Sequence, residues 1–383
     1  MHSNLFFSFS TLLVLVCFIS VGSVEASSSM WTRTYGGDDW DSLEAVIQTS
    51  DEGFALVGRT KSFGSGVYEF WVIKTDSLGN VQWNKTYGAG SAMSIVQTSD
   101  GGYVIAGSKL VKTDSGGNVE WEKNYEATSM IQTINGGYAL TDGEFWLTKT
   151  DARGNLQWEK NHDGPERESA QWIIQTNDGG YAIAGITTPS VGEGDFLLIK
   201  TDSVGELEWS NTYGSEDKDE GHVVVQTSDG GYALAGLMWN RSGGDAGVVK
   251  TDSEGNMEWK QNYGEGIAWA MALTNDGGIV IACDSLVKIA SEGNIQWSQP
   301  YPYSSVRCAI QTSDYGYALV GEHIIVANND LSDIDAWFIK TDPEGNIPEF
   351  PSWTPLLIMI IAVLTVAVVY RRRLREHSQR RDD

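Results

Sequence analysis

Apolar and polar residues alternate in short runs along most of this chain, as in YALAG at 232–236 and FWVIK at 70–74. A period of two is typical of a β-strand with one buried face. The runs end at two recurring turn motifs, one resembling QTSDGGY and the other KTDSxGN. Asp or Asn at the start of such a turn bonds its own backbone, and glycine supplies the positive φ of a bulged hairpin. Each motif therefore predicts a hairpin.

Both motifs occur seven times. The first begins at residues 48, 97, 132, 175, 226, 273 and 311, and the second begins at Lys74, Lys112, Lys149, Lys200, Lys250, Lys288 and Lys340. Two hairpins in each unit give four strands, so the sequence predicts an all-β, seven-bladed β-propeller. We interpret the repeated lysines as packing residues with a buried stem and an ammonium group near an Asp; a functional ring of cations is the alternative.

A tryptophan follows most GN pairs by three residues, at Trp83, Trp121, Trp158, Trp209, Trp259 and Trp297. The last turn has none, because Asn346 runs directly into IPEFP. The stretch WTRTYGG at 31–37 matches the strand that this last unit lacks. We therefore predict that Trp31 begins the closing strand of a propeller spanning 27–346. Closure of the ring removes two open sheet edges.

The run xDxxGNxxW resembles the tryptophan-docking repeat of PQQ-like β-propellers, within the wider WD40 and kelch-type group, over about residues 31–346. The resemblance implies that Trp31 and the six tryptophans named above dock between blades. The turn is one residue shorter than the family's, and seven blades replace the eight of the quinoprotein enzymes. The resemblance thus implies the fold and does not extend to a quinone, and we expect no cofactor, with calcium as the alternative.

An apolar segment near the N-terminus precedes the small residues Val24 and Ala26. This pattern predicts a cleaved signal peptide over 1–26, although no Lys or Arg precedes the apolar core. An uncleaved anchor and a lipid-modified Cys17 are the alternatives.

The C-terminal part of the chain predicts a membrane anchor. A proline-containing stalk at 347–352 leads into the apolar stretch 353–370, which is just long enough for one transmembrane helix. The tail 371–383 carries six arginines and is expected to stay cytoplasmic. We therefore expect a single-pass protein of the cell membrane with the propeller outside.

The PEFPSW prefix, the apolar stretch and the arginine tail together resemble the three-part C-terminal sorting signals of archaeal surface proteins. That resemblance implies a prokaryotic cell-surface protein. Permanent anchoring by the helix is our first expectation, and replacement of the helix by a lipid is the alternative.

Charge and cysteine content narrow the function classes. The chain holds 51 Asp and Glu against 26 Lys and Arg, and the part outside the basic tail is more acidic still. Such a field repels nucleic acid and anionic lipid. Cys283 and Cys308 fall at non-equivalent strand positions of neighbouring units, which favours two buried thiols over a disulfide.

One face of the predicted propeller varies between units. If the four strands of each unit are lettered a to d, the two turn motifs are the a–b and c–d turns and share one side. The d–a and b–c connections on the opposite side differ in length and sequence. Variable loops on a rigid scaffold commonly carry recognition. Acidic and aromatic residues there could bind a protein, a carbohydrate or a cation; ordinary solvated loops are the alternative. This candidate rim comprises Asp38, Asp39, Trp40, Asp41, Glu166, Glu168, Asp217, Asp219, His222 and Trp239. Asn84 and Asn240 lie in glycosylation patterns.

No catalytic constellation emerges from the sequence. His162, His222 and His323 fall in different units without metal-ligand spacing, and no GxSxG, HExxH or phosphate-binding loop occurs. Our first hypothesis is accordingly a monomeric, non-enzymatic binding module. A glycan-active hydrolase or lyase with acids at the channel mouth is the second hypothesis, and a structural envelope component is the third.

Overall fold

A computed structural model describes residues 30–162, 164, 167–188, 194–215, 217–240, 243–301, 305–327 and 330–347. The chain divides into units 1–347 and 348–383, of which the second lies outside the described residues. The predicted signal peptide (1–26), membrane helix (353–370) and basic tail (371–383) lie outside them too, as does all of the stalk except Ile347. Within the described part of the chain, no helix is long and apolar enough to cross a membrane.

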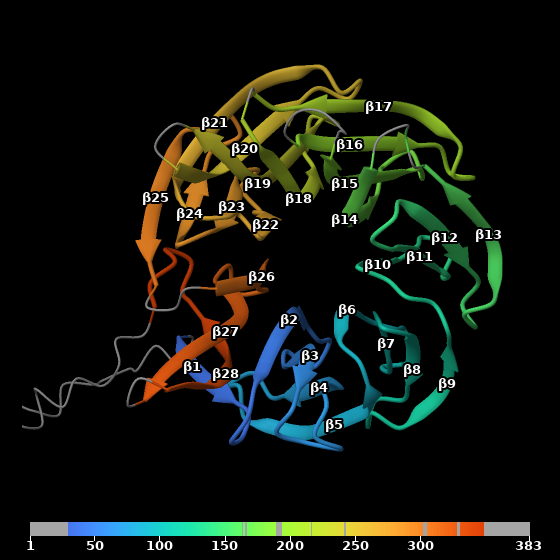
Figure 1. The fold of residues 1–383 in the computed structure, drawn as a ribbon, viewed down its shortest axis with the longest axis vertical. Coiled ribbons are helices and arrows are strands. Elements are labelled where there is room, and N and C mark those ends of the chain that lie inside the picture. Colours follow the sequence, from blue (N-terminus) through green and yellow to red (C-terminus); the bar gives the residue numbers. More distant parts are fainter. Residues whose placement is uncertain are drawn as a thin grey trace, which may run out of the picture. The chain divides into compact units, whose positions relative to one another are not determined.

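The described residues form seven four-stranded antiparallel sheets arranged in a ring (Figure 1). We call the axis that the seven innermost strands surround the channel. The strand bounds of the first three blades are β2 (Asp41–Gln48), β3 (Phe54–Thr60), β4 (Glu69–Thr75) and β5 (Val81–Ala89); β6 (Ala92–Gln97), β7 (Tyr103–Gly107), β8 (Leu110–Thr113) and β9 (Val119–Lys123); and β10 (Ser129–Gln132), β11 (Tyr138–Thr141), β12 (Trp146–Thr150) and β13 (Leu156–Asn161). Within each blade the strands follow one another outward from the channel as a, b, c and d. The predicted seven-bladed, all-β fold is confirmed.

Blades 4 to 7 follow the same order. Their strands are β14 (Arg167–Gln175), β15 (Tyr181–Thr188), β16 (Phe196–Thr201) and β17 (Leu207–Tyr213); β18 (Asp219–Gln226), β19 (Tyr232–Asn240), β20 (Gly243–Thr251) and β21 (Met257–Glu265); β22 (Ala270–Leu273), β23 (Ile279–Ala282), β24 (Ser285–Ile289) and β25 (Ile295–Pro300); and β26 (Ser305–Gln311), β27 (Tyr317–Ala327), β28 (Asp330–Lys340) and β1 (Trp31–Tyr35).

The ring closes through the N-terminal strand. β1 is the outermost strand of blade 7 and pairs antiparallel with β28, in register from Trp31 opposite Lys340 to Tyr35 opposite Ala336. The indole of Trp31 lies edge-on to Phe338 of β28, with ring centroids 4.6 Å apart. The predicted closing role of WTRTYGG is confirmed.

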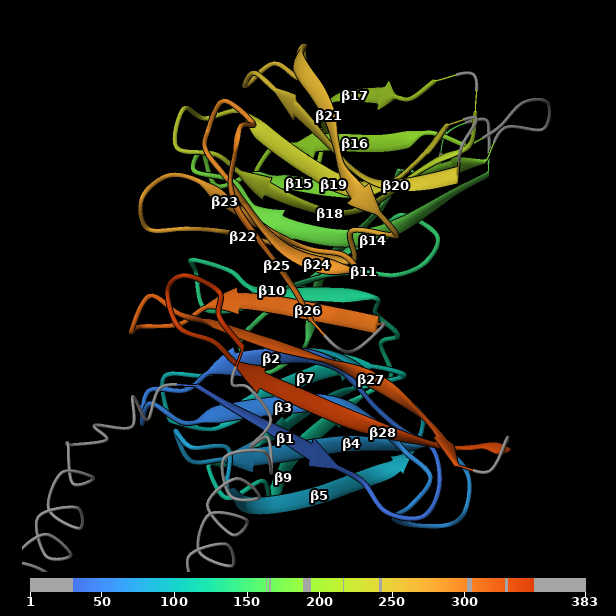
Figure 2. The same ribbon diagram turned by 90° about the vertical axis from the view of Figure 1, so that its left-hand side faces the viewer.

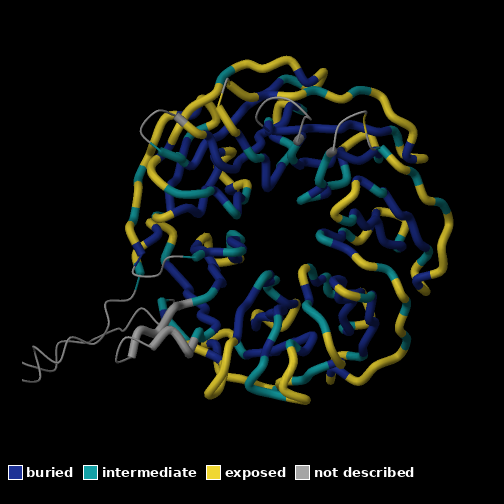
Figure 3. Tube along the Cα trace, in the orientation of Figure 1, coloured by how far each residue is buried: buried dark blue, intermediate teal, exposed yellow. Residues whose placement is uncertain are grey.

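The core lies between blades rather than at a single centre. Strands b and c are buried along almost their whole length, as in β4 and β16, whereas the outermost strands alternate between exposed and half-buried residues (Figure 3). Each sheet therefore buries its inner strands against the two neighbouring sheets, and the apolar contacts cross from one repeat to the next.

The seven tryptophans pack against the next blade's c–d turn. At Gly205, which has a φ of +78°, an added Cβ would lie 2.5 Å from the ring of Trp158, so neither the space nor the turn geometry is compatible with another residue. The same indole–glycine pairs are Trp31–Gly79, Trp83–Gly117, Trp121–Gly154, Trp209–Gly255, Trp259–Gly293 and Trp297–Gly345. Trp31 also donates through Nε1 to the carbonyl of Ser77, 3.1 Å away.

The seven lysines that begin the c–d motif are buried, at 2 to 5% exposure. Six meet a carboxylate from the a–b turn of their own blade, as when the Nζ of Lys288 lies 2.7 Å from both carboxylate oxygens of Asp276. Their interpretation as packing residues agrees with this geometry, because a buried ammonium group cannot form an exposed ring.

Blade 3 departs from this pattern. Asn135 replaces the turn aspartate, and among the described residues Lys149 donates only to the carbonyl of Thr150 and the amide oxygen of Gln157. Burial lowers the pKa of Lys149, and the nearby carboxylate of Asp151 offsets only part of that effect.

Substitution of Asn135 by Asp is expected to stabilise the protein by about 0.5 to 1 kcal/mol, since it supplies the ion pair found in the other six blades. Urea unfolding at pH 7 would measure the gain, which should shrink when the pH is lowered below the pKa of the new carboxyl group. An Asn135→Asp variant no more stable than the parent would contradict this account of Lys149.

Cys283 and Cys308, the two cysteines in the described part of the chain, are free and buried. Burial raises the pKa of the Cys308 thiol to about 11. The preference for two buried thiols over a disulfide is thus confirmed.

Candidate functional site

The two ends of the blades differ in how many of their polar side chains form hydrogen bonds or ion pairs within the protein. Because the strands alternate in direction, the a–b and c–d turns lie on one side of the ring and the d–a and b–c connections on the other, at the left and right of the edge-on view (Figure 2). We call these sides the uniform face and the variable face.

Side chains of the uniform face are committed to holding turns and blades together. Asp76 accepts the backbone N–H groups of Leu78 and Asn80, and the amide oxygen of Gln48 accepts the N–H of Ser313 from the preceding blade at 2.8 Å. Equivalent bonds recur in other blades, as from Ser50 to Gln97. The repeated sequence on this face is therefore explained by architecture.

The candidate rim residues are divided between distant blades of the variable face. Asp38, Asp39, Trp40 and Asp41 precede or begin β2, whereas Asp217, Asp219, His222 and Trp239 belong to blade 5, whose innermost strand β18 lies across the channel (Figure 1). Glu168 is half-buried on β14, and Glu166 lies outside the described residues. The structure does not gather these residues into one site.

Asp41 serves the loops themselves. It is 1% exposed, and its carboxylate accepts the N–H of Gly37 at 2.9 Å and the hydroxyl groups of Ser62 and Thr60. It thereby ties the d–a connection to the b–c connection of blade 1. Asp39 similarly accepts the N–H of Trp40 at 2.8 Å. Trp40 remains 38% exposed.

Asp219 and Trp239 do converge. They border a cavity of about 300 Å³ in blade 5 together with Ser215, Met238, Lys260, Gln261 and Asn262. The backbone N–H of Trp239 donates to Asp219 at 3.0 Å, and burial raises the pKa of that carboxyl group. The indole of Trp239 is 45% exposed, so this cavity offers an aromatic surface beside polar groups.

Of the two asparagines in glycosylation patterns, only Asn84 has a described side chain. Asn84 is exposed on the outermost strand β5, where its amide oxygen accepts the indole N–H of Trp71 at 2.6 Å. The side chain of Asn240 lies outside the described residues, as does that of His323.

A set of channel residues is not apparent from the sequence analysis, which singled out only His222 among them. The position four residues before the end of each innermost strand holds a different residue in every blade. These residues, which lie within the strand or directly before it, are Glu44, Met93, Thr128, Gln171, His222, Trp269 and Arg307. In five blades it is the extra residue of a β-bulge. The sequence signal that could have identified these residues is a position that varies inside an otherwise uniform repeat.

On one side of the channel these residues form a connected wall. The rings of His222 and Trp269 lie 4.3 Å apart, and the guanidinium group of Arg307 lies 5.1 Å from the centre of the Trp269 ring. Arg307 also pairs with Glu322 at 2.8 Å. His222, and then Lys218, hold the pKa of Glu220 at about 2. The wall joins blades 5, 6 and 7 across two inter-blade seams.

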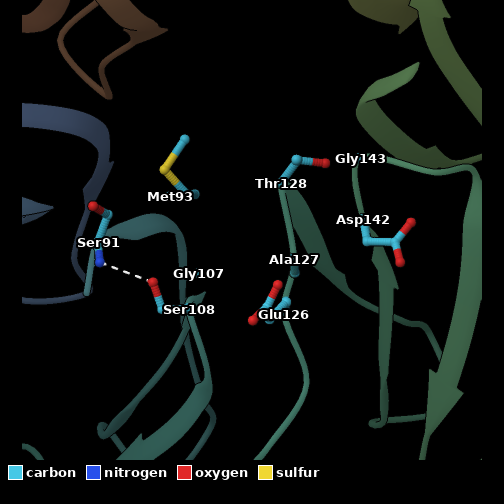
Figure 4. A pocket seen from close by; sticks show the side chains of 9 residues that line it. All are labelled: Ser91, Met93, Gly107, Ser108, Glu126, Ala127, Thr128, Asp142 and Gly143. Atoms are coloured by element: carbon cyan, nitrogen blue, oxygen red, sulfur yellow. Dashed lines mark hydrogen bonds between the residues drawn. The ribbon is translucent and has the colours of Figure 1, made fainter. Parts of the chain in front are cut away.

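Blades 2 and 3 lie on the other side of the channel (Figure 1). Blades 2 and 3 have short strands of four to six residues, and a cavity of about 300 Å³ lies between them on the variable face (Figure 4). Two channel residues, Met93 and Thr128, contribute to it. The remaining lining residues are Ser91, Gly107, Ser108, Glu126, Ala127, Asp142 and Gly143.

In the part of the chain that the structure describes, no group of three or more His, Cys, Asp or Glu side chains is placed to hold a metal ion. The acids of the variable face are instead separated or bonded to nearby backbone groups.

No family model matches the chain, and no curated protein matches it by sequence. Among solved structures, the WD40 β-propeller domain of Doa1 is similar, with a TM-score of 0.56 and 12% identity, over 82% of this chain and 98% of that one. The C-terminal WD40 domain of Sif2 has a TM-score of 0.51 and 9% identity, over 80% and 82%. BamB from Moraxella catarrhalis reaches a TM-score of 0.45 at 10% identity, over 80% and 99%. At 12% and 9% identity, the likeness to the two WD40 domains shows the fold alone: this chain folds as a β-propeller.

Proposed function

We propose that this protein is a cell-surface interaction module, held at the membrane by its C-terminal segment, that binds a protein partner through the variable face. A β-propeller fold suits this role, since it presents many independent loops on a rigid ring. The proposal includes the predicted signal peptide and membrane helix, because an anchored propeller whose last c–d turn faces the membrane would direct its variable face outward.

The observation that carries the proposal is the unequal use of the two faces. The repeated Gln, Asp and Lys side chains of the uniform face hold turns and blade seams together. That face also has one cavity of about 290 Å³ beside the exposed Tyr315. The exposed indoles of Trp40 and Trp239 and two further cavities lie on the variable face. A protein selected only for a stable ring has no need of exposed indoles such as Trp40 and Trp239 on one face.

Site-specific photo-cross-linking on intact cells tests this function. A photoreactive residue placed at Trp40 or Trp239 is expected to capture a discrete partner in good yield. The matched controls are Leu207 and Val119, which are similarly exposed (54% and 48%) but lie where strand d leaves the uniform face.

Cross-links that arise equally from the control positions, or only from them, would refute binding through the variable face. Capture from Trp40 and Trp239 alone would support it.

A further inference from the structure

We propose that the cavity between blades 2 and 3 receives a lysine or arginine side chain of the protein partner. The inference rests on the proposed function and names the chemistry that this part of the variable face recognises.

The cavity is built from two short connections. The segment 126–128 crosses from blade 2 to blade 3 and is fixed where Ala127 donates its N–H to the carbonyl of Gly107 at 2.9 Å. On the opposite wall the hydroxyl group of Ser108 accepts the N–H of Ser91 at 3.0 Å (Figure 4). Because both walls are held by backbone bonds, the cavity is preformed and needs no rearrangement to admit a side chain.

Two carboxylates border this cavity, and none of its described lining residues is a lysine or an arginine. The side chain of Glu126 is exposed and forms no hydrogen bond or ion pair with the described residues. Asp142 accepts the N–H groups of Glu144 at 2.9 Å and Trp146 at 3.1 Å, which holds its carboxylate in place. The nearby Lys109 is engaged with Glu122 at 2.9 Å on the outermost strand and does not line the cavity.

The rest of the lining suits the stem of a basic side chain. Met93 and Ala127 offer apolar surface, and the serine hydroxyl groups can accept hydrogen bonds near the carboxylates. Lysine and arginine pair an aliphatic stem with a charged head, so they match a cavity with both kinds of surface. A bare metal ion would use only the two carboxylates.

The charge of the whole chain favours the same class of partner. With 51 acidic residues against 26 basic ones, the protein attracts a basic surface at long range, and the cavity supplies the short-range contact. Recognition is therefore expected to weaken as salt is added.

A ligand-observed NMR titration of the full chain in detergent tests the inference. The probes are acetyl-Gly-Arg-Gly-amide, acetyl-Gly-Lys-Gly-amide and the citrulline isostere of the arginine peptide, which has the same shape without the charge. Both basic peptides are expected to bind, and the citrulline peptide at least tenfold more weakly.

The double variant Glu126→Gln and Asp142→Asn is expected to lose at least tenfold in affinity for the basic peptides. The Asp142→Asn substitution retains an oxygen that can accept the two N–H groups, and the Glu126 side chain has no structural bond, so folding should be preserved. Glu265→Gln, which changes an exposed acid at the end of β21 on the variable face and outside the candidate rim, is the control and should bind as the parent does.

Equal binding of the citrulline peptide, or an equal loss in the Glu265→Gln variant, would overturn the inference. The proposed function is separable from it: if the double variant still cross-links the partner from Trp40 and Trp239 with unchanged yield, the interaction face stands and this cavity is not its receptor.

Discussion

Deletion of residues 31–35 is expected to abolish cooperative folding of the propeller. These five residues form β1, which pairs with β28 over its whole length and places the buried Trp31 against Gly79 of blade 1. Without β1, β28 becomes an open edge, the seam between blades 7 and 1 loses its docking indole, and the exposed edge invites aggregation. Urea unfolding followed by circular dichroism, together with size-exclusion chromatography, would measure the effect.

A milder variant isolates the docking contact. Trp31→Ala is expected to lower the free energy of unfolding by about 3 to 5 kcal/mol, the usual range for a buried tryptophan. Thr34→Ala is the control, because Thr34 lies on the same strand but is exposed, and it should change stability by less than about 0.5 kcal/mol. A deletion variant that unfolds at the urea concentration of the intact protein would show that β1 does not close the ring.

Stability is expected to fall steeply as the pH drops from about 4 to about 2. The lysine-paired aspartates Asp100, Asp178, Asp229 and Asp276 have a pKa of about 2, below the ordinary Asp value of about 3.9 in an unfolded chain. A depressed folded-state pKa stabilises the fold above the unfolded pKa, and that stabilisation is lost as the pH falls through the folded value. Each side chain is more than half exposed, so each pair contributes roughly 0.5 to 1 kcal/mol.

Urea midpoints measured between pH 7 and pH 2 would test this dependence. The quadruple variant with Asn at these four positions reproduces the arrangement that blade 3 already has at Asn135. It should be about 2 to 4 kcal/mol less stable at pH 7 and should lose much of its pH dependence below pH 4. A quadruple variant with the parent's acid sensitivity would assign that sensitivity to other carboxylates.

The sequence was less informative about where strands begin on the variable face. The sequence analysis placed Asp41, Asp219 and His222 in the loops of the candidate rim, yet β2 begins at Asp41, and β18, which contains His222, begins at Asp219. All three side chains are buried. Polar residues at a strand start resemble loop residues in sequence, and only the neighbouring connection, such as Ser62 against Asp41, shows that they are enclosed.

The sequence by itself determined the blade count, the closing strand and the chemistry of the uniform face. Those features depend on contacts that recur with the repeat, namely glycine and Asp in each turn, Trp against the next glycine, and Lys beside its own Asp, so the pattern encodes them many times over. Only the tertiary structure decided which variable residues meet. The His222–Trp269–Arg307 wall and the cavity of Glu126 and Asp142 join different blades through contacts that occur once. A contact that occurs once leaves no repeated pattern in the sequence. Such a contact depends on the strand lengths and bulges that place unlike blades side by side.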